Sequence, residues 1–141
     1  MGIISLASGS SCWRGLDYYK EKRVVELNKI NENEYSSIVK GTNNYNVHLD
    51  IEHPRKSSCN CPLANGKRII CKHIVATYFT AFPNEAVSFE EEQNRLQEEY
   101  EKEQEEEYDK AIKYLNKMSK QELIEELIQV FDYGPEWIYN D

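Results

Sequence analysis

Cys59-Asn60-Cys61 and Cys71-Lys72-His73 decide the fold of this chain, and nine residues separate the two triplets. Three thiols and one imidazole therefore fall within fifteen residues, and each pair has one residue between its members. Thiolate sulfur and neutral imidazole are ligands that tetrahedral zinc takes in structural sites. We therefore predict that Cys59, Cys61, Cys71 and His73 bind one zinc ion. Because protein fills all four positions, the site is predicted to be structural rather than catalytic.

The spacing also predicts how the ligands are presented. Alternate residues of an extended segment point to the same side, so Cys59 and Cys61 can aim at one ion from a strand end or tight turn. Residues two apart on a regular helix point about 200° away from each other. Cys71 is therefore expected just before a helix, and His73 in its first turn.

Basic residues flank the four ligands. Zinc with three thiolates and one imidazole carries a net charge of −1, and nearby cations lower thiol pKa values and stabilise that charge. The alternative is a set of ordinary buried cysteines beside a surface histidine, which the pairing, the spacing and the basic flanks disfavour. The flanking cations are Lys56, Lys67, Arg68 and Lys72.

Other segments strengthen one resemblance. Several segments are similar to successive parts of the SWIM zinc finger. They are Arg14 to Tyr19 followed by Val24-Val25, Tyr45 to Leu49, Ser58 to Pro62 and Cys71 to Ala76. The resemblance covers about residues 11–82. It implies zinc at the four ligands, a ββα-like metal core and a role in binding DNA or protein. Some relatives lie beside helicases or in transposases, but no motif of either enzyme is present, so neither activity carries over. Ser119 to Phe131 resembles the short helical segment that often follows this finger in bacterial proteins.

Length and cysteine usage bound the class of protein. A chain of 141 residues is one domain, or a small domain with an appendage. The apolar run from Ile3 to Ala7 has no charged residue before it and is too short for a signal peptide or a membrane span. We therefore expect a reducing, cytoplasmic compartment and no membrane contact, with cysteines that hold metal rather than form disulfides.

Charge is divided unevenly along the chain. Residues 1–84 carry 11 Lys and Arg against 7 Asp and Glu, whereas residues 85–141 carry 6 against 18. The whole-chain charge of −8 therefore hides a mildly basic half that holds the cysteines. We predict a SWIM-type zinc-binding domain at 11–84 and an acidic helical extension at 85–141.

The hydrophobic pattern of the first half predicts an α+β fold. A helix capped by Ser11 and continuing to Lys20 is expected first. A small three-stranded antiparallel meander follows at residues 23–27, 35–40 and 45–52, and strict alternation marks the third strand most clearly. The zinc-bound β/α finger then ends in a helix that stops before Pro83.

C-terminal helices complete the predicted fold. Ser88 and Glu91 have capping-box spacing and predict a helix to about Lys117. Ser119 and Glu122 repeat that spacing before an amphipathic helix through Phe131, which Gly134-Pro135 would end. The acidic run from Glu98 to Asp109 reads as a solvated helix face. A sharper hypothesis is that it mimics phosphate and competes for the basic residues.

Remaining candidates have ordinary structural interpretations. Cys12 is expected to be a packed small hydrophobe, with a free reactive thiol as the alternative. His48 falls on the polar face of its strand and is expected to face solvent. His53 is near enough in sequence to be a spare ligand or a support for one, which is the less favoured reading. Four tyrosines are expected in the core rather than stacked on bases: Tyr18, Tyr19, Tyr35 and Tyr45.

Two function classes follow, and neither is enzymatic. A basic patch around the metal would let the finger bind nucleic acid, DNA first, through phosphate contacts. The alternative is an adaptor for a protein partner, such as a separately encoded helicase. A Cys71–His73 nucleophile is disfavoured because the metal claims both residues, and no small-molecule substrate is expected. The patch comprises Arg55, Lys56, Lys67, Arg68 and Lys72, which could also be solubilising charge.

Overall fold

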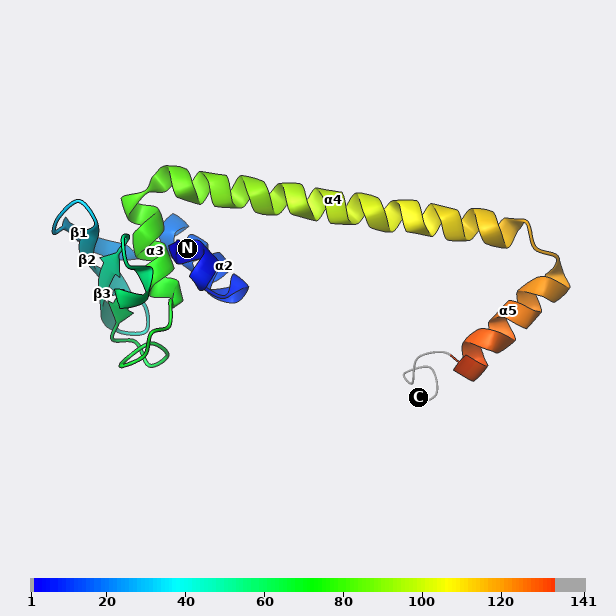
Figure 1. Cartoon of the computed structure of the whole chain (residues 1–141), viewed down its shortest axis with the longest axis horizontal. Coiled ribbons are helices and arrows are strands. Elements are labelled where there is room, and N and C mark those ends of the chain that lie inside the picture. Colours follow the sequence, from blue (N-terminus) through cyan, green and yellow to red (C-terminus); the bar gives the residue numbers. More distant parts are fainter. Residues whose placement is uncertain (1, 134–141) are drawn as a thin grey trace. The chain divides into compact units, whose positions relative to one another are not determined.

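The computed structural model describes residues 2–133 (Figure 1). The chain forms two compact units, one ending at Glu91 and the other beginning at Glu92. The first unit is α+β, as predicted, and contains the sheet, three helices and the start of a fourth helix. The described residues of the second unit are helical except for a turn at residues 117–119.

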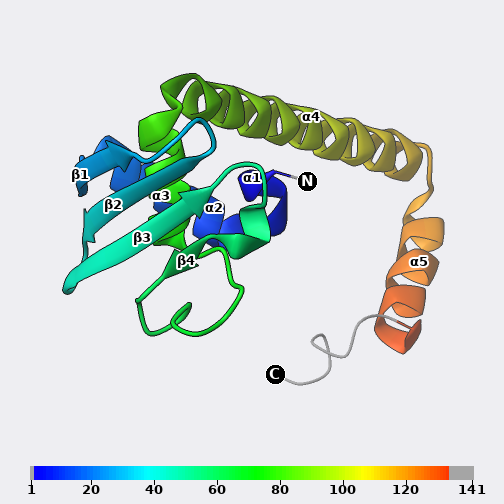
Figure 2. The same ribbon diagram turned by 60° about the vertical axis from the view of Figure 1, so that its left-hand side comes forward.

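One antiparallel sheet organises the first unit, with its strands in the order β1-β2-β3-β4 (Figure 2). The three predicted strands are present, each within two residues of its expected bounds. The sheet has a fourth strand because Cys59 and Ser58 pair with Val47 and His48. Two residues are too few to show an alternating pattern, so the sequence did not reveal it. The strands are β1 (Val24–Lys29), β2 (Glu34–Lys40), β3 (Asn44–Asp50) and β4 (Ser58–Cys59).

β3 ends at Asp50, two residues earlier than predicted. The carboxylate of Asp50 accepts a hydrogen bond from the backbone N–H of His53 at 2.7 Å, and this bond turns the chain. A short 3-10 helix, η1 (Pro54–Lys56), follows and returns the chain to the sheet edge. The turn therefore places the first two cysteines beside β3.

Helix α3 (Lys72–Ala81) packs against β1, β2 and β3. Its apolar residues Ile74, Val75 and Phe79 are completely buried, and they form the centre of the core. A buried polar bridge fixes its position on the sheet, since Ser37 of β2 and Thr77 share a hydrogen bond of 2.7 Å. The predicted end of this helix before Pro83 is confirmed.

Helix α2 (Gly9–Lys20) covers α3 and comes close to it at Gly15. A Cβ atom at Gly15 would lie 2.5 Å from the Cβ of Val75, which is shorter than any real contact. Glycine therefore allows the two helices to touch. The predicted cap was wrong: Ser8, not Ser11, accepts the capping hydrogen bond, at 3.1 Å from the N–H of Ser11. A short helix α1 (Ile3–Leu6), which the sequence analysis did not predict, places Ile3 in the core.

Helix α4 (Pro83–Asn116) begins five residues before the predicted cap at Ser88. Proline suits the first turn of a helix because its missing N–H has no helical partner there. The beginning of α4 belongs to the first unit, because Phe89 packs on Trp13 and Phe79 with ring centres 5.4 and 5.7 Å apart. The first residues of α4 therefore contribute to the core of the first unit.

In the second unit, the rest of α4 leads to α5 (Lys120–Tyr133). The predicted capping box is confirmed, since Ser119 accepts a hydrogen bond from the N–H of Glu122 at 3.2 Å. Side chains at 98–109 are exposed, as expected of a solvated face. The predicted stop at Gly134-Pro135 lies outside the described residues. Among helices at 2–133, none has the length and apolarity that crossing a membrane requires.

Candidate metal centre

The first two cysteines are held by the edge of the sheet. Cys59 pairs with Val47 of β3, and Asn60 is tied to Asn46 by two hydrogen bonds of 2.8 and 3.3 Å. Asn60 is exposed, and its hydrogen bonds hold the segment against β3. The side chains of Cys59 and Cys61 therefore point inward, and they are 4 % and 2 % exposed. The prediction that alternate residues of an extended segment present two sulfur atoms is confirmed.

The other two ligands stand at the start of α3. Cys71 is the N-cap residue of this helix and His73 lies in its first turn, as predicted from their spacing. Helix geometry alone would separate the two side chains, but the extended backbone of Cys71 turns its sulfur back towards the imidazole. Gly66, with a φ of 72°, lies in the loop that connects the two pairs of ligands.

These four residues converge on one point. Their ligand atoms all lie within 4.8 Å of one another, and all four side chains are buried. The Nδ1 atom of His73 lies 3.7 Å from each of the sulfur atoms of Cys59 and Cys71. In a tetrahedral zinc site, ordinary bond lengths place sulfur and nitrogen ligands about 3.6 Å apart. The donor set and its spacing therefore fit zinc, and Nδ1 is the nitrogen that faces it.

Aromatic rings enclose the imidazole. Tyr45 of β3 lies 4.6 Å and Tyr18 of α2 lies 5.5 Å from the ring centre of His73. They keep the ring in one orientation, with Nδ1 turned to the sulfur atoms. Within residues 2–133, the other nitrogen, Nε2, is buried with no hydrogen-bond partner.

The thiols of Cys59 and Cys71 shift each other's pKa in opposite directions. A hydrogen bond from the Cys59 thiol lowers the pKa of Cys71 to about 4, and the imidazole of His73 and the backbone N–H of Ile74 contribute to the same shift. The same hydrogen bond, together with burial, raises the pKa of Cys59. Without metal, one proton is therefore retained between these two sulfur atoms at neutral pH, and zinc must displace it.

Comparison with known families agrees with this geometry. Residues 45–81 match the family model described as the SWIM zinc finger, and this segment contains all four ligands. The chain carries a SWIM zinc finger. No curated protein and no solved structure matches the chain. The Cys₃His cluster of this finger is its zinc site, and the ion would tie the sheet edge to the start of α3.

The other histidines lie apart from the metal centre of the SWIM finger. His48 is half-buried rather than simply solvent-facing, because its Nε2 lies 3.1 Å from a carboxylate oxygen of Glu34. His53 is exposed and uses its backbone N–H to close the turn with Asp50, and it is not among the four clustered ligands. The reading of His53 as a spare ligand therefore gains no support.

Cys12 and the four tyrosines occupy the places predicted for them. The Cys12 side chain is buried, burial raises the pKa of its thiol, and its sulfur lies 3.5 Å from the carbonyl oxygen of Ile4. All four tyrosines contribute to the core, with one buried and three packed against it at the edge. The buried one is Tyr35, and the others are Tyr18, Tyr19 and Tyr45.

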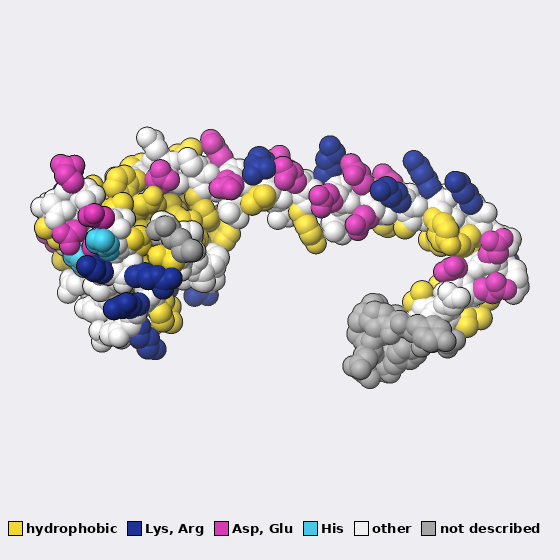
Figure 3. All heavy atoms as spheres, in the orientation of Figure 1, with side chains coloured by type: hydrophobic (Ala, Val, Ile, Leu, Met, Phe, Trp, Pro, Cys, Tyr) yellow, Lys and Arg dark blue, Asp and Glu magenta, His cyan; other side chains and the backbone are white. Residues whose placement is uncertain are grey.

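The structure separates the five predicted basic residues. Arg55, Lys56 and Arg68 line one groove beside η1. Lys72 lines a different pocket, beside Cys61, Cys71 and His73, and its Nζ lies 5.0 Å from the ring centre of Tyr18. Lys67 is exposed and lines neither surface. Figure 3 shows Lys and Arg side chains gathered on part of the first unit and acidic side chains on another part.

Sequence reasoning missed Arg14. This exposed residue of α2 joins Lys72 around a pocket next to the zinc ligands. Its position four residues before Tyr18 places both on one helix face, and that spacing was a signal that could have found it. The cations near the metal centre therefore come from α2 as well as from residues 55–72.

Zinc affinity is expected to fall as the pH is lowered. For each proton that zinc displaces, the affinity falls roughly tenfold when the pH is lowered by one unit. The raised pKa of Cys59 keeps at least one such proton in place at neutral pH. The check is competition with a coloured chelator at several pH values, with calorimetry to count released protons. Cys12→Ala should leave the slope unchanged, and a pH-independent affinity would contradict the prediction.

Proposed function

We propose that the SWIM finger binds nucleic acid, DNA first, through basic side chains around its zinc site. Phosphate contacts are made by groups of Lys and Arg side chains, and here the cations form two such groups. Three of these cations line the groove beside η1 and two line the pocket beside the ligands. Zinc would hold the start of α3, which carries Lys72, against the segment of Cys59 and Cys61.

The proposal rests on which cations of the first unit form ion pairs and which do not. Among residues 2–133, the first unit's ion pairs engage Lys20, Arg23 and Lys29 with carboxylates. The cations around the metal centre are in none of the ion pairs of the described chain. Residues 1–91 carry 11 Lys and Arg and 10 Asp and Glu, so the grouping of charge matters here rather than the net charge. These cations are Arg14, Arg55, Lys56, Lys67, Arg68 and Lys72.

Fluorescence anisotropy of zinc-loaded full chain against labelled single- and double-stranded DNA tests the proposal. We expect dissociation constants of about 1–100 µM, typical of binding without sequence preference. Affinity should fall with salt, with a log–log slope no steeper than about −5 on duplex DNA if six cations each meet one phosphate. Arg55→Gln with Lys56→Gln and Arg68→Gln should weaken binding and flatten that slope.

A chain that ends at Glu91 tests the acidic extension in the same assay. This end keeps the packed residues Ala86 and Phe89, which a cut at Asn84 would remove. Tighter binding by the shorter chain would show that the acidic helix competes for the cations. Equal affinity would reject that hypothesis, and an absence of binding by both chains at low salt would reject the nucleic-acid proposal.

An adaptor role is the second candidate, and α5 supports it. Leu127, Ile128 and Phe131 are each more than half exposed and recur at helical spacing. A partner with an apolar groove would cover such a face. Leu127→Asp should abolish capture of that partner without changing zinc binding, and it should leave DNA binding intact if the finger acts alone.

We further propose that the protein is not an enzyme and works in the cytoplasm. Four protein ligands leave no open position at which zinc could activate water. The four cysteines are free thiols in the described chain, and a reducing compartment would keep the three ligands able to bind metal.

A further inference from the structure

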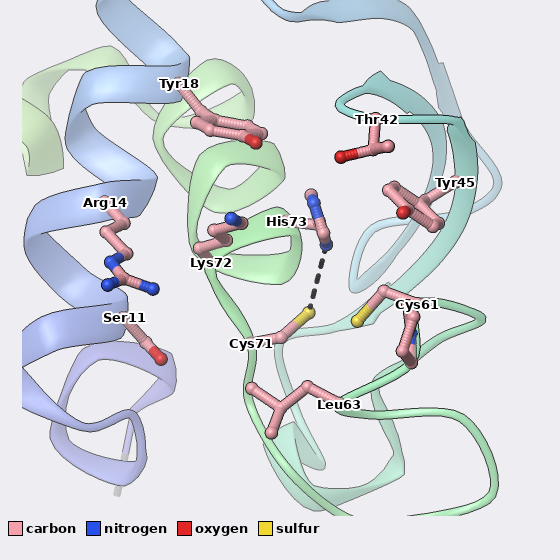
Figure 4. A pocket seen from close by; sticks show the side chains of 11 residues that line it. Ser11, Arg14, Tyr18, Thr42, Tyr45, Cys61, Leu63, Cys71, Lys72 and His73 are labelled. Carbon is pink, nitrogen blue, oxygen red and sulfur yellow. Dashed lines mark hydrogen bonds between the residues drawn. The ribbon is translucent and has the colours of Figure 1, made fainter.

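A pocket of about 250 Å³ opens beside the zinc ligands (Figure 4). Cys61, Cys71 and His73 form one wall, and α2 and the turn before β3 supply the others. Resting on the proposed function, we infer that this pocket receives one phosphate of the nucleic-acid backbone, and that the Nε2–H of His73 donates a hydrogen bond to it. Arg14 and Lys72 supply the positive charge.

His73 provides the observation that points to a ligand. The residue is 3 % exposed, and its Nε2 has no hydrogen-bond partner within residues 2–133. Figure 4 shows one ring nitrogen turned to the sulfur of Cys71 and the other turned towards Tyr18 and Thr42. Because zinc takes Nδ1, the proton must reside on Nε2, which becomes a donor. A metal-bound histidine ordinarily gives that proton to an acceptor, and an anion bound in the pocket that His73 lines could supply one.

The charges around the pocket favour an anion. Zinc with its three thiolates and one imidazole carries a net −1, which alone would repel phosphate. Arg14 and Lys72 both line the pocket, and neither forms an ion pair in the described chain. Together they reverse the sign, and Lys72 is positioned by the face of the Tyr18 ring. Arginine suits this role because its planar fork matches two phosphate oxygens.

The volume of the pocket and the residues that line it favour one phosphate of a polymer over a separate, larger ligand. The pocket is smaller than the roughly 300–1,000 Å³ of sites that enclose a whole drug-sized ligand. The hydroxyl groups of Ser11 and Thr42 line it and can donate to further phosphate oxygens.

Nuclear magnetic resonance of zinc-loaded, ¹⁵N-labelled full chain tests the inference, because the His73 Nε2–H signal reports directly on the pocket. A single-stranded oligodeoxynucleotide of about eight nucleotides is one probe, and inorganic phosphate is the other. We expect the oligonucleotide to shift this signal and slow its exchange with water. Arg14→Gln and Lys72→Gln should each weaken binding about tenfold and reduce the salt slope by about one. Lys29→Gln removes the same charge from β1, away from the pocket, and should change affinity less than about twofold.

The possible outcomes distinguish a failure of the pocket inference from a failure of the proposed nucleic-acid function. If DNA binds and the Arg14 and Lys72 variants behave like Lys29→Gln, the pocket inference is overturned while the nucleic-acid function stands. If DNA fails to bind but inorganic phosphate shifts the His73 signal in a manner that Arg14→Gln abolishes, the pocket is a phosphate site and the nucleic acid is not its source. If neither probe moves the signal, the pocket holds only water and the inference fails.

Discussion

Cys59→Ser should unfold the first unit and release its zinc. Structural zinc contributes on the order of 10 kcal/mol of folding free energy in small fingers, and serine removes one of four ligands. Among the described residues, Phe79 is the only aromatic side chain that is completely buried, so this small core has little to replace that contribution. Metal analysis should find the zinc lost, and the dispersed amide signals of the strands should collapse in an NMR spectrum.

Chelation of the unchanged chain should give the same collapse, and zinc should reverse it. Cys12→Ser is the matched control, since it alters an equally buried thiol that lies outside the ligand cluster. That variant should keep its zinc and its strand signals. A Cys59→Ser protein that remains folded without metal would contradict the view that zinc stabilises this fold.

Phe79→Ala should destabilise the zinc-loaded first unit by about 3–5 kcal/mol, the usual loss for a buried phenylalanine. Phe79 is completely buried and packs against Tyr19 of α2, Tyr78 of its own helix and Phe89 of α4. Removing the ring leaves a cavity where three helices meet. Urea unfolding in excess zinc, followed by circular dichroism, measures the change in the free energy of unfolding.

Val87→Ala is the control for that measurement. Val87 lies on the first part of α4, close in sequence to Phe89, but its side chain is 54 % exposed. Alanine also favours helix, so the change should stay within about 0.5 kcal/mol. Equal losses in the two variants would show that the helix start, and not the ring of Phe79, controls stability.

The zinc site was predictable because its information is local. The fifteen-residue motif specifies the ligand types, and the two periodicities of backbone structure specify how each pair is presented. Which imidazole nitrogen meets the metal was not predictable, because Tyr18 and Tyr45 set the orientation of that ring from segments far away in the sequence. Arg14 reaches the site through the packing of α2 on α3, although its spacing from Tyr18 was a signal within α2 itself.

Errors in the predicted elements have similar causes. β4 is two residues long and exists because β3 lies beside it, so no pattern of its own marks it. The start of α4 was misplaced because Ser88 has the spacing of a cap, whereas the packing of Phe89 on Trp13 requires helix before that point. Strands with strict alternation were found within two residues, since burial of one face leaves a pattern that tertiary contacts seldom override.

The contact at Gly15 affects which part of the chain can be excised or transferred between genes as a folded unit. Residues 45–81 contain the metal ligands, but α2 covers α3 from before that segment, and β1 and β2 supply half of the sheet. Excised alone, the segment would present Val75 and its apolar neighbours to water and would associate with other molecules or be degraded. The transferable module is therefore the whole unit ending at Glu91, and a shuffled gene fragment would have to carry the glycine together with the cysteines.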